Sequence, residues 1–211
     1  MPRRAYVSSV RSAAAAEKRD RVLEAAAKLL REDASIARFS LDSVAKAAGV
    51  TRLTVYHQFG SRRGLLEAVF DEIAREGGLH RIADAMAMAD PREALDRLVE
   101  IFCTFWNRDS AVGRLHDAMA TDPEFADAVL ERNERRRRGL TALLERVAAK
   151  SASRKMRQDA IDTIFALTSY AMFAMLRPGR SAEDVCRLIQ SACRAALEPV
   201  SSNKKQHPTR S

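Results

Sequence analysis

The sequence predicts an all-α protein. Alanine, leucine, arginine and glutamate dominate, sustained alternation of β-branched residues is nearly absent, and no Asn-Gly pair marks a hairpin turn. Apolar residues instead recur three and four positions apart, between breaks that carry helix-capping residues. With 211 residues, the chain is long enough to bury a core without the help of disulfides or a metal.

The first third of this helical pattern predicts three short helices after a flexible basic arm at residues 1–12. An amphipathic helix follows the arm, at residues 13–31. Ser40 is the N-cap of a second, short helix that ends at Gly49, and Thr51 caps a third. We place this first domain at residues 13–60.

The remaining helices form a larger domain, predicted at residues 61–198. A long helix begins near Arg62, and the pairs Asp90-Pro91 and Asp122-Pro123 each combine a capping Asp with a proline at the first helical position. Further helices are predicted over residues 156–176 and from about residue 182 to 197. The tail, residues 199–211, has nothing to bury and is expected to be disordered.

The excess positive charge lies in the first third of the chain. Residues 1–63 hold 13 Lys and Arg against 6 Asp and Glu, whereas residues 64–211 hold 23 against 22. A basic excess confined to one end is typical of a segment that faces a polyanion.

Several classes of protein are disfavoured by what the sequence lacks. It has no run of roughly 20 apolar residues that would span a membrane and no signal peptide, so we expect a cytoplasmic protein with no membrane partner. Cys103, Cys186 and Cys193 lack the C-x-x-C spacing of metal or redox sites and are interpreted as reduced core residues. Common catalytic motifs are absent too, so we predict no enzyme, cofactor or metal.

The segment from Ser40 to Gln58 has the spacing of a helix-turn-helix, whose second helix enters the major groove of DNA. At 100° per residue, Val55 and Phe59 fall on the side of the second helix that packs inward. The opposite side carries Arg52, Leu53, Tyr56 and His57. A helical hairpin whose exposed residues merely keep it in solution is the alternative.

The outward side chains have the chemistry that DNA recognition needs. Arg52 can donate two hydrogen bonds to guanine, Leu53 can touch a thymine methyl, and Arg62 and Arg63 add charge at a helix start where a phosphate binds. The predicted DNA-binding residues are Ser40, Thr51, Arg52, Leu53, Thr54, Tyr56, His57, Arg62 and Arg63.

Residues 39–70, FSLDSVAKAAGVTRLTVYHQFGSRRGLLEAVF, closely resemble the DNA-binding signature of the tetracycline-repressor (TetR) family of bacterial transcription regulators. The shared pattern has the caps Ser40 and Thr51, the Ala-Gly-Val ending of the first helix and the run Thr54-Val55-Tyr56. It continues with the aromatic Phe59 and with the basic Arg62 before the paired Leu65 and Leu66, and the chain departs from it at Gln58 and Arg63. The resemblance implies DNA contacts by Arg52, Leu53, Thr54, Tyr56, His57 and Arg62. It also implies a second half that binds a small effector and dimerises through its last two helices.

The helix predicted at residues 159–176 is apolar almost all round, which indicates burial on more than one side. Together with the last helix it can build a two-fold, four-helix interface. The predicted interface residues are Ala171, Met172, Met175, Val185, Ile189, Ala192 and Ala196. Burial wholly inside one subunit is the alternative.

Aromatic and methionine side chains with a few polar atoms suggest an effector pocket for a small apolar or amphipathic molecule. The candidates are Phe102, Trp106, His116, Met119, Phe125, Phe165, Tyr170 and Phe173, which equally fit an ordinary helical core. The basic run at residues 131–138 is interpreted as a solvated helix face, because its Glu and Arg residues pair four positions apart.

Taken together, the sequence predicts a dimeric, ligand-responsive repressor that binds double-stranded DNA at a palindromic operator. A transcriptional activator, or a DNA-coating regulator without a small-molecule effector, is the alternative.

Overall fold

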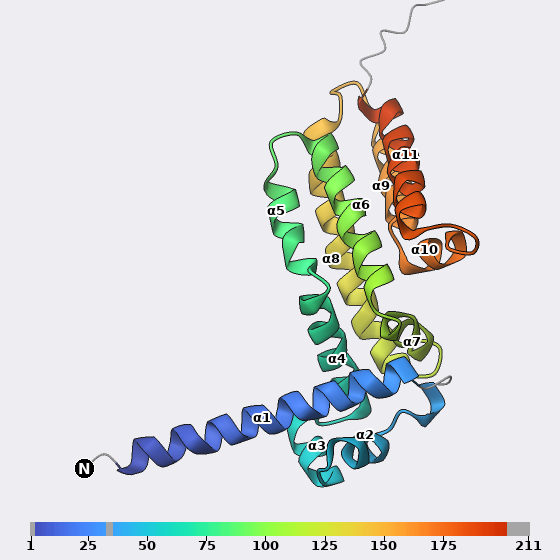
Figure 1. Ribbon diagram of the computed structural model, residues 1–211. Coiled ribbons are helices and arrows are strands. Elements are labelled where there is room, and N and C mark those ends of the chain that lie inside the picture. The colour runs from blue at the N-terminus through green and yellow to red at the C-terminus, as the bar shows by residue number, and fades with distance from the viewer. Residues whose placement is uncertain (1–2, 33–35, 202–211) are drawn as a thin grey trace, which may run out of the picture. The chain divides into compact units, whose positions relative to one another are not determined.

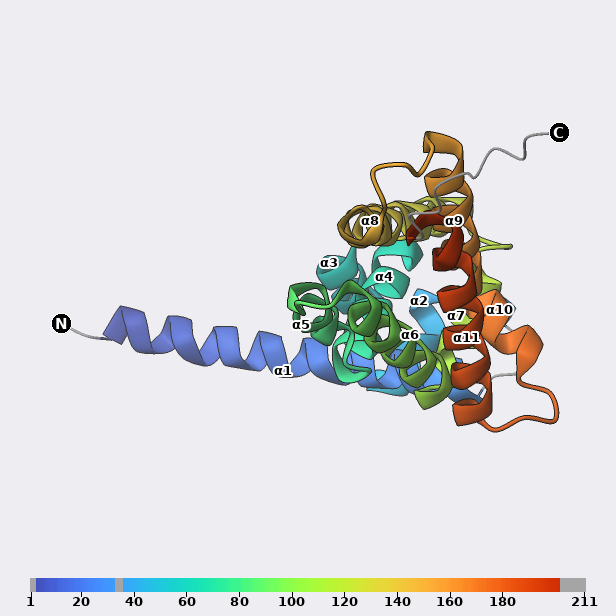
Figure 2. The ribbon, with the colours of Figure 1, turned by 90° about the horizontal axis from the view of Figure 1, so that it is seen from above.

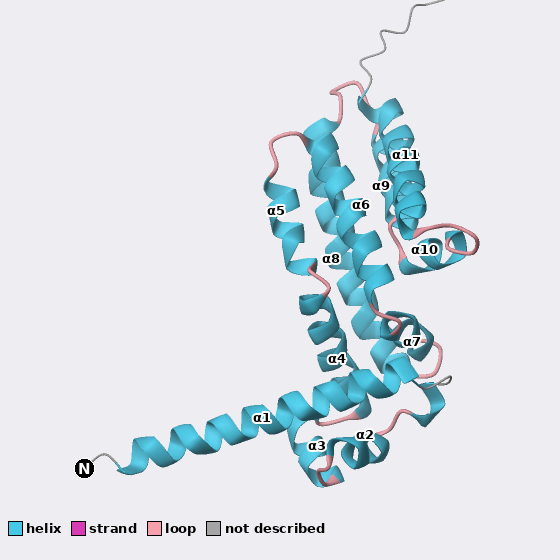
Figure 3. Ribbon diagram, in the orientation of Figure 1, coloured by secondary structure: helices cyan, strands magenta, loops and turns pink. Residues whose placement is uncertain are grey.

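The computed structural model describes residues 3–32 and 36–201, and every regular element in them is helical (Figure 3). This confirms the predicted fold class. The helices are α1 (Arg3–Glu32), α2 (Leu41–Ala48), α3 (Arg52–Phe59), α4 (Arg62–Glu76), α5 (Ile82–Ala87), α6 (Pro91–Arg108), α7 (Ala111–Ala118), α8 (Pro123–Val147), α9 (Arg154–Leu167), α10 (Tyr170–Leu176) and α11 (Ala182–Ser201) (Figure 1). Two short 3-10 turns, η1 (Ile36–Arg38) and η2 (Leu79–Arg81), lie between them.

The chain divides into two compact units. Unit 1 comprises Met1–Glu76 and Asp109–Val129, and unit 2 comprises Gly77–Arg108 and Leu130–Ser211. The sequence places the first boundary at residue 60, whereas unit 1 also contains α4 and α7. Helix α8 begins in unit 1 and ends in unit 2.

Unit 1 is built around a long first helix. Helix α1 packs on α2, α4 and α7, and the core includes the fully buried side chains of Val22, Val44, Val55 and Leu65. Burying such a side chain contributes about 1.5–3 kcal/mol relative to leaving it exposed. These contacts hold α2 and α3 in place.

Helix α1 begins earlier than predicted. Residues 3–12, expected to form a flexible arm, belong to a continuous helix that starts at Arg3, and the first two residues of that arm lie outside the described residues. No Gly or Pro interrupts residues 3–32, so nothing in this stretch ends a helix. Figure 2 shows its N-terminal part extending past α3, and residues 13–21 are exposed.

Unit 2 is a helical bundle in which α11 packs on α6 and α9 (Figures 1 and 2). Its core combines leucines from α6 and α8 with isoleucines from α9 and one face of α11. Val185, Ile189 and Cys193 lie on that face and are buried.

The helix predicted over residues 156–176 is broken. It consists of α9 and α10, which differ in direction by 59°. Ser169 starts α10 because its hydroxyl accepts a hydrogen bond from the backbone N–H of Met172 at 3.2 Å. The Thr168 hydroxyl donates to the carbonyl of Ile164 at 2.8 Å. The apolar pattern therefore does not continue along a single helix.

The last helix is longer than predicted. Residues 199–201, expected to begin a disordered tail, are the end of α11, and Val200 is buried. The backbone N–H of Ala149 donates to the carbonyl of Val200 at 2.9 Å, which holds this end against the α8–α9 connection. The rest of the predicted tail, residues 202–211, lies outside the described residues.

Among the described residues, no single helix is both long and apolar enough to cross a membrane; only α9 and α10 taken together, as a bent pair, reach that length and composition.

Candidate functional site

The turn between α2 and α3 is fixed by local hydrogen bonds. Ser40 and Ser43 form a capping box at the start of α2, and Gly49 ends that helix with φ of +65°, where glycine is favoured. The Thr51 hydroxyl then accepts from the backbone N–H of Thr54 at 3.1 Å and starts α3. The hydroxyls of Ser40 and Thr51 thus serve as caps, and that is the role the structure gives these two predicted DNA-binding residues.

Helix α3 has one buried and one exposed side, in the phase that the sequence predicts. Val55 is fully buried, whereas Arg52 and His57 are exposed. Leu53 and Tyr56 are exposed apolar side chains at 61% and 54%. Two large apolar groups on eight residues of surface helix are typical of a face that meets a partner.

Arg52 has a weak partner within unit 1. Its Nε lies 3.3 Å from Oδ2 of Asp42, and both side chains are largely exposed. An exposed pair of this kind contributes about 0–1 kcal/mol. Arg52 therefore keeps its guanidinium accessible at the N-terminal end of α3.

Arg19, on α1, supports the other end of α3, and sequence reasoning did not find it. Its guanidinium lies 4.5 Å from the centre of the Phe59 ring, and Nη1 donates to the carbonyl of Gln58 at 3.3 Å. Gln58, where the chain departs from the family pattern, has its side-chain Oε1 buried without a partner among the described residues.

Arg62 is held by contacts inside unit 1, and its expected role as a phosphate ligand stays a prediction. Its Nε donates to the carbonyl of Phe39 at 3.0 Å, and Nη1 donates to Oδ2 of Asp122 at 2.7 Å. Asp122 also accepts from the backbone N–H of Phe125 at 3.0 Å and so caps α8. Only 28% of the Arg62 side chain is exposed, because it joins α4 to the start of α8.

Arg63 also has a partner nearby. Its Nε donates to Oε1 of Glu67 at 2.6 Å, one helical turn further along α4. The start of α4 is capped by Ser61, whose hydroxyl accepts from the backbone N–H of Gly64 at 3.0 Å. One of the amides expected to receive a phosphate is thus already used.

The predicted pocket residues fall in both units. His116, Met119 and Phe125 belong to unit 1, where Phe125 is fully buried. The other five, Phe102, Trp106, Phe165, Tyr170 and Phe173, belong to unit 2. Trp106 lies 6.1 Å from Phe102 and 5.8 Å from Tyr170 between ring centres. The structure therefore brings together an aromatic cluster from α6, α9 and α10, without the three residues of unit 1.

Arg136 belongs to this cluster, although the sequence places it on a solvated face. Its guanidinium carbon lies 4.2 Å from the centre of the Phe165 ring and 5.7 Å from that of Phe102. Nη1 donates to the carbonyl of Thr168 at 2.6 Å, and Nη2 to that of Phe165 at 3.3 Å. Burial, with a smaller contribution from the charge of Arg137, lowers the pKa of Arg136 to about 10.

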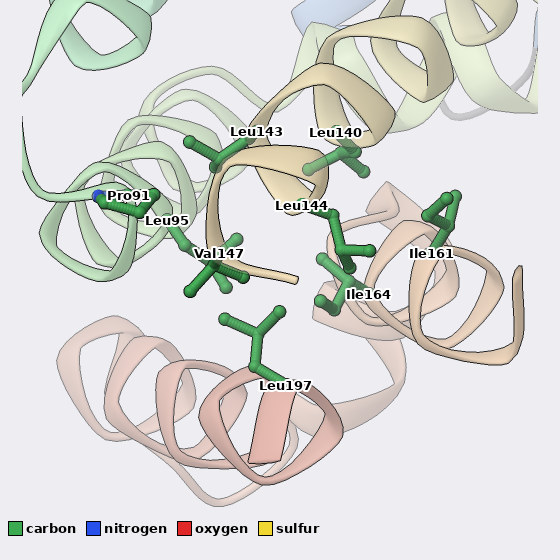
Figure 4. A pocket seen from close by; sticks show the side chains of 9 residues that line it. All are labelled: Pro91, Leu95, Leu140, Leu143, Leu144, Val147, Ile161, Ile164 and Leu197. Atoms are coloured by element: carbon green, nitrogen blue, oxygen red, sulfur yellow. The ribbon is translucent and has the colours of Figure 1, made fainter. Parts of the chain in front are cut away.

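A small apolar cavity lies between α6, α8, α9 and α11 (Figure 4). Its lining residues are Pro91, Leu95, Leu140, Leu143, Leu144, Val147, Ile161, Ile164 and Leu197, none of which the sequence analysis proposed as pocket residues. Its free volume of about 10 Å³ is room for about one water molecule, far below the roughly 300–1,000 Å³ typical of pockets for drug-sized ligands.

Two of the predicted interface residues lie in the core instead. Val185 and Ile189 are buried inside unit 2, so they cannot contact a second subunit from that position. Ala171 and Met175 are exposed, and Met172, Ala192 and Ala196 are half-buried. Leu188, which was not predicted, is also exposed on α11. The predicted apolar stripe on α11 is thus present, but its buried residues pack on α6 and α9 of the same chain.

The three cysteines are free thiols at the contact of α6 with α11. A hydrogen bond between Cys103 and Cys186 raises the pKa of Cys103 and lowers that of Cys186. Burial raises the pKa of Cys193 to about 12. In the described part of the chain, no three His, Cys, Asp or Glu side chains gather in a way that could hold a metal ion.

Residues 22–69 match the family model for bacterial regulatory proteins of the tetR family. The chain is 31% identical over 112 residues to the HTH-type transcriptional regulator EthR of Mycolicibacterium smegmatis, a match that covers 52% of this chain and 51% of EthR. The aligned part of the chain thus spans about half the length of this curated relative.

Solved structures share the fold over most of the chain. A transcriptional regulator from Rhodococcus sp. RHA1 has a TM-score of 0.68 at 18% identity, covering 88% of this chain and 98% of its own. A transcriptional regulator from Saccharomonospora viridis, solved in complex with choline, has a TM-score of 0.60 at 18% identity, covering 83% and 95%. At such identities the likeness concerns the fold.

Proposed function

Because the chain belongs to the tetR family of bacterial regulatory proteins, a family of DNA-binding transcriptional regulators, we propose that it is a ligand-responsive repressor. It binds a palindromic operator as a homodimer, in the cytoplasm where the DNA lies. The observation that carries this proposal is the exposed side of α3, where Arg52, Leu53, Tyr56 and His57 surround a helix anchored on Val55.

The charges of residues 1–63 support binding to a polyanion. The excess of seven positive charges in residues 1–63 is nearly the whole net charge of +8. Counterion release from DNA phosphates makes such binding strongly salt-dependent. Base edges then select the sequence, with Arg52 placed at the N-terminal end of α3 where recognition helices make their contacts.

A homodimer supplies two such helices for two half-sites, spaced about 34–36 Å apart along the DNA. The exposed apolar side chains of Met175 and Leu188, on α10 and α11, support an interface in unit 2. The aromatic cluster of the same unit supports a small apolar or amphipathic effector. The Saccharomonospora viridis regulator, solved in complex with choline, supports the wider proposal that a small molecule binds.

Effector and operator oppose each other if each binds better to a different conformation. Helix α8 can carry this coupling because it is the continuous helix that belongs to both units. Its first residue follows Asp122, which Arg62 holds at 2.7 Å. Helix α4, the long helix that the sequence predicts from near Arg62, lies wholly in unit 1.

Fluorescence anisotropy with labelled DNA from upstream of the gene tests the proposal. We expect tighter binding to that DNA than to a scrambled duplex at physiological salt, with a stoichiometry of two chains per site. Equal affinity for both duplexes would leave only sequence-independent DNA coating. Transcription that rises with added protein would identify an activator.

A further inference from the structure

Two of the three free cysteines meet where α6 packs on α11, and these two helices lie side by side in unit 2 (Figures 1 and 2). The thiol of Cys103, on α6, is hydrogen-bonded to the thiol of Cys186, on α11. A disulfide brings its two sulfur atoms to about 2 Å from each other. Thiols that already share a hydrogen bond therefore need only a small movement to be joined.

Other contacts between the same helices fix how α6 and α11 run past each other. Arg92, at the start of α6, donates from Nη2 to the hydroxyl of Ser201, at the end of α11, at 2.8 Å. One turn further along α6, Asp96 accepts from Nη2 of Arg194 at 2.6 Å. Residue numbers thus rise along α6 while they fall along α11, so the two helices are antiparallel.

This register places Cys103 opposite Cys186 without reference to the thiols themselves. Cys103 follows Asp96 by seven positions on the same side of α6, and Cys186 precedes Arg194 by eight positions on α11. Cys193 lies seven positions from Cys186, which is about 10 Å along the helix axis. The Cα atoms of a disulfide are usually about 4.4–6.8 Å apart. The register therefore selects Cys103, and not Cys193, as the partner of Cys186.

The two facing thiols differ in their access to solvent and in their acidity. Cys103 is only 5% exposed, whereas Cys186 is half-buried. The hydrogen bond from Cys103 lowers the pKa of Cys186, against the opposing effect of partial burial, and the same bond raises the pKa of Cys103. Oxidants react with the thiolate, and they do so where it can be reached. Cys186 is therefore the thiol that reacts first, and Cys103 is the thiol beside it.

We propose that Cys186 is a site of oxidation by peroxide and that it then forms a reversible disulfide with Cys103. First, the thiolate of Cys186 attacks one oxygen of hydrogen peroxide. An S–O bond forms and the O–O bond breaks, and the leaving hydroxide takes up the proton that the thiol had released to solvent. The product is a sulfenic acid and one water molecule.

In the second step, the sulfur of Cys103 attacks the sulfur of this sulfenic acid. An S–S bond forms and the S–O bond breaks, and the leaving hydroxide takes the proton of the Cys103 thiol to give a second water molecule. Two thiols and one hydrogen peroxide thus give one disulfide and two waters, and the two sulfur atoms lose two electrons to the peroxide.

The disulfide ties the start of α11 to the second half of α6. In a cytoplasm that keeps thiols reduced, such a bond lasts only while oxidant is present, which is typical of redox sensing. Leu188, exposed two positions after Cys186, lies on the surface proposed for the homodimer interface. These two consequences rest on the proposed function, whereas formation of the disulfide does not.

Peptide mapping tests the crosslink directly, because trypsin places the three cysteines on three different peptides. Cleavage after Lys and Arg gives residues 98–108 with Cys103, residues 181–187 with Cys186 and residues 188–194 with Cys193. The reduced, folded full chain is treated briefly with a small excess of hydrogen peroxide. We expect the intact mass to fall by about 2 Da, for two lost hydrogen atoms, and the first two peptides to be joined. Dithiothreitol should reverse both changes.

Three results of this mapping would overturn the proposal. The first is a chain that keeps all three thiols free, and the second is a crosslink that includes residues 188–194. The third is a disulfide between two chains, seen as a band of doubled mass on a non-reducing gel.

Substitutions separate the reactive thiol from its partner. Cys186→Ser should react with hydrogen peroxide at least about tenfold more slowly than the wild type. Cys103→Ser should stop at the sulfenic acid, which dimedone traps on residues 181–187. Cys193→Ala is the matched control and should form the same crosslink as the wild type. Equal rates for Cys186→Ser and the wild type would contradict the order of the two steps. If Cys103→Ser fails to fold, the mapping of the wild type still decides, because it needs no variant.

DNA binding of the reduced chain, measured on the same samples, distinguishes this proposal from the proposed function. A crosslink without recognition of upstream DNA would leave the oxidation site standing and remove the repressor. Specific DNA binding by a chain whose thiols stay free in peroxide would do the reverse.

Discussion

Gly64, in the first turn of α4, has no room for a side chain. A Cβ placed there would lie 2.1 Å from the backbone oxygen of Phe59, which cannot move without shifting the end of α3. Gly64→Ala is therefore expected to lower the free energy of unfolding by at least about 2 kcal/mol. Gly139→Ala is the matched control, because Gly139 lies inside α8 with nothing within 4 Å of the added carbon.

That control should raise the free energy of unfolding by about 0.5–1 kcal/mol, since alanine is the better helix former. Urea denaturation of both variants gives the comparison. A Gly64→Ala protein as stable as the wild type would mean that α3 and α4 approach each other less closely than described.

Arg52 is an exposed cation at the start of α3, which is the recognition helix in the proposed function, and its loss should reduce discrimination between DNA sequences. Arg52→Ala is expected to lower the preference for operator over scrambled DNA by about 1–3 kcal/mol. Its stability should hardly change because the pair with Asp42 is exposed. Competition anisotropy measures the preference, and Asp42→Asn serves as the control that keeps Arg52. Equal weakening on both duplexes would show that Arg52 binds phosphate only.

Cys193 makes the stability of unit 2 depend on pH in the alkaline range. Its folded pKa of about 12 lies above the ordinary value of 9.0. The unfolded chain therefore loses the thiol proton first, and stability declines as pH rises above 9. This residue should account for about 1.4 kcal/mol of the loss at pH 10.

Unfolding in urea with a reductant, at pH 7 and pH 10, measures this decline. Cys193→Ala should reduce it by that amount. The control Val185→Ala, another buried residue of α11 without a titrating group, should lower stability equally at both pH values. A pH dependence unchanged in Cys193→Ala would show that the thiol ionises without opening the core.

At the scale of elements, the sequence is informative where a boundary depends on neighbouring residues. The caps Ser40 and Thr51 and the stop at Gly49 act over three or four positions, and the structure has each of them as predicted. The break at Ser169 was missed because one capping serine inside a long apolar run gives a weak signal. The early start of α1 was missed because no residue there forbids a helix.

The candidate sites were predicted less completely, since their contacts join distant parts of the chain. The exposed side of α3 follows from helical phase alone. The sequence analysis inferred a phosphate contact for Arg62 and a solvated position for Arg136 from their neighbours in sequence. Their hydrogen-bond partners in the structure lie 60 and 32 positions away. A charged residue in a basic run gives no sign of such a partner, because the local pattern is the same for a solvated and a buried side chain.

The link between α4 and α8 gives a prediction at this scale. Arg62→Ala leaves the carboxylate of Asp122 partly buried and unpaired, so we expect a loss of about 3 kcal/mol in stability. Arg63→Ala, which breaks a pair within one helix, should cost about 0.5 kcal/mol. The role of Arg62 is then decided by the slope of the logarithm of the DNA-binding constant against the logarithm of the salt concentration. A slope equal to that of the wild type fits a structural link, whereas a slope smaller in magnitude by about one indicates a lost phosphate contact.

At the scale of the whole molecule, the proposed repression depends on two recognition helices on one operator, one from each chain of the proposed homodimer. Binding through two half-sites raises affinity because the second contact becomes intramolecular, an effect of about 10²–10⁴. The exposed side chains of Met175, at 73%, and Leu188, at 43%, are the apolar groups on α10 and α11 that a second subunit would cover. A dimer that buries these two side chains should be disrupted when a charged residue replaces them, because burying an unpaired charge is costly.

The double variant Met175→Glu and Leu188→Glu should therefore be monomeric in sedimentation. Its affinity for a full operator should fall by about 100-fold or more, while binding to a single half-site stays the same. Leu130→Glu places the same charge on an apolar side chain of α8 that is 53% exposed, and it should remain dimeric. A double variant that still sediments as a dimer would place the interface elsewhere on unit 2. Loss of half-site binding would instead indicate that the charges damage the fold, because α3 lies in unit 1 and is untouched by either substitution.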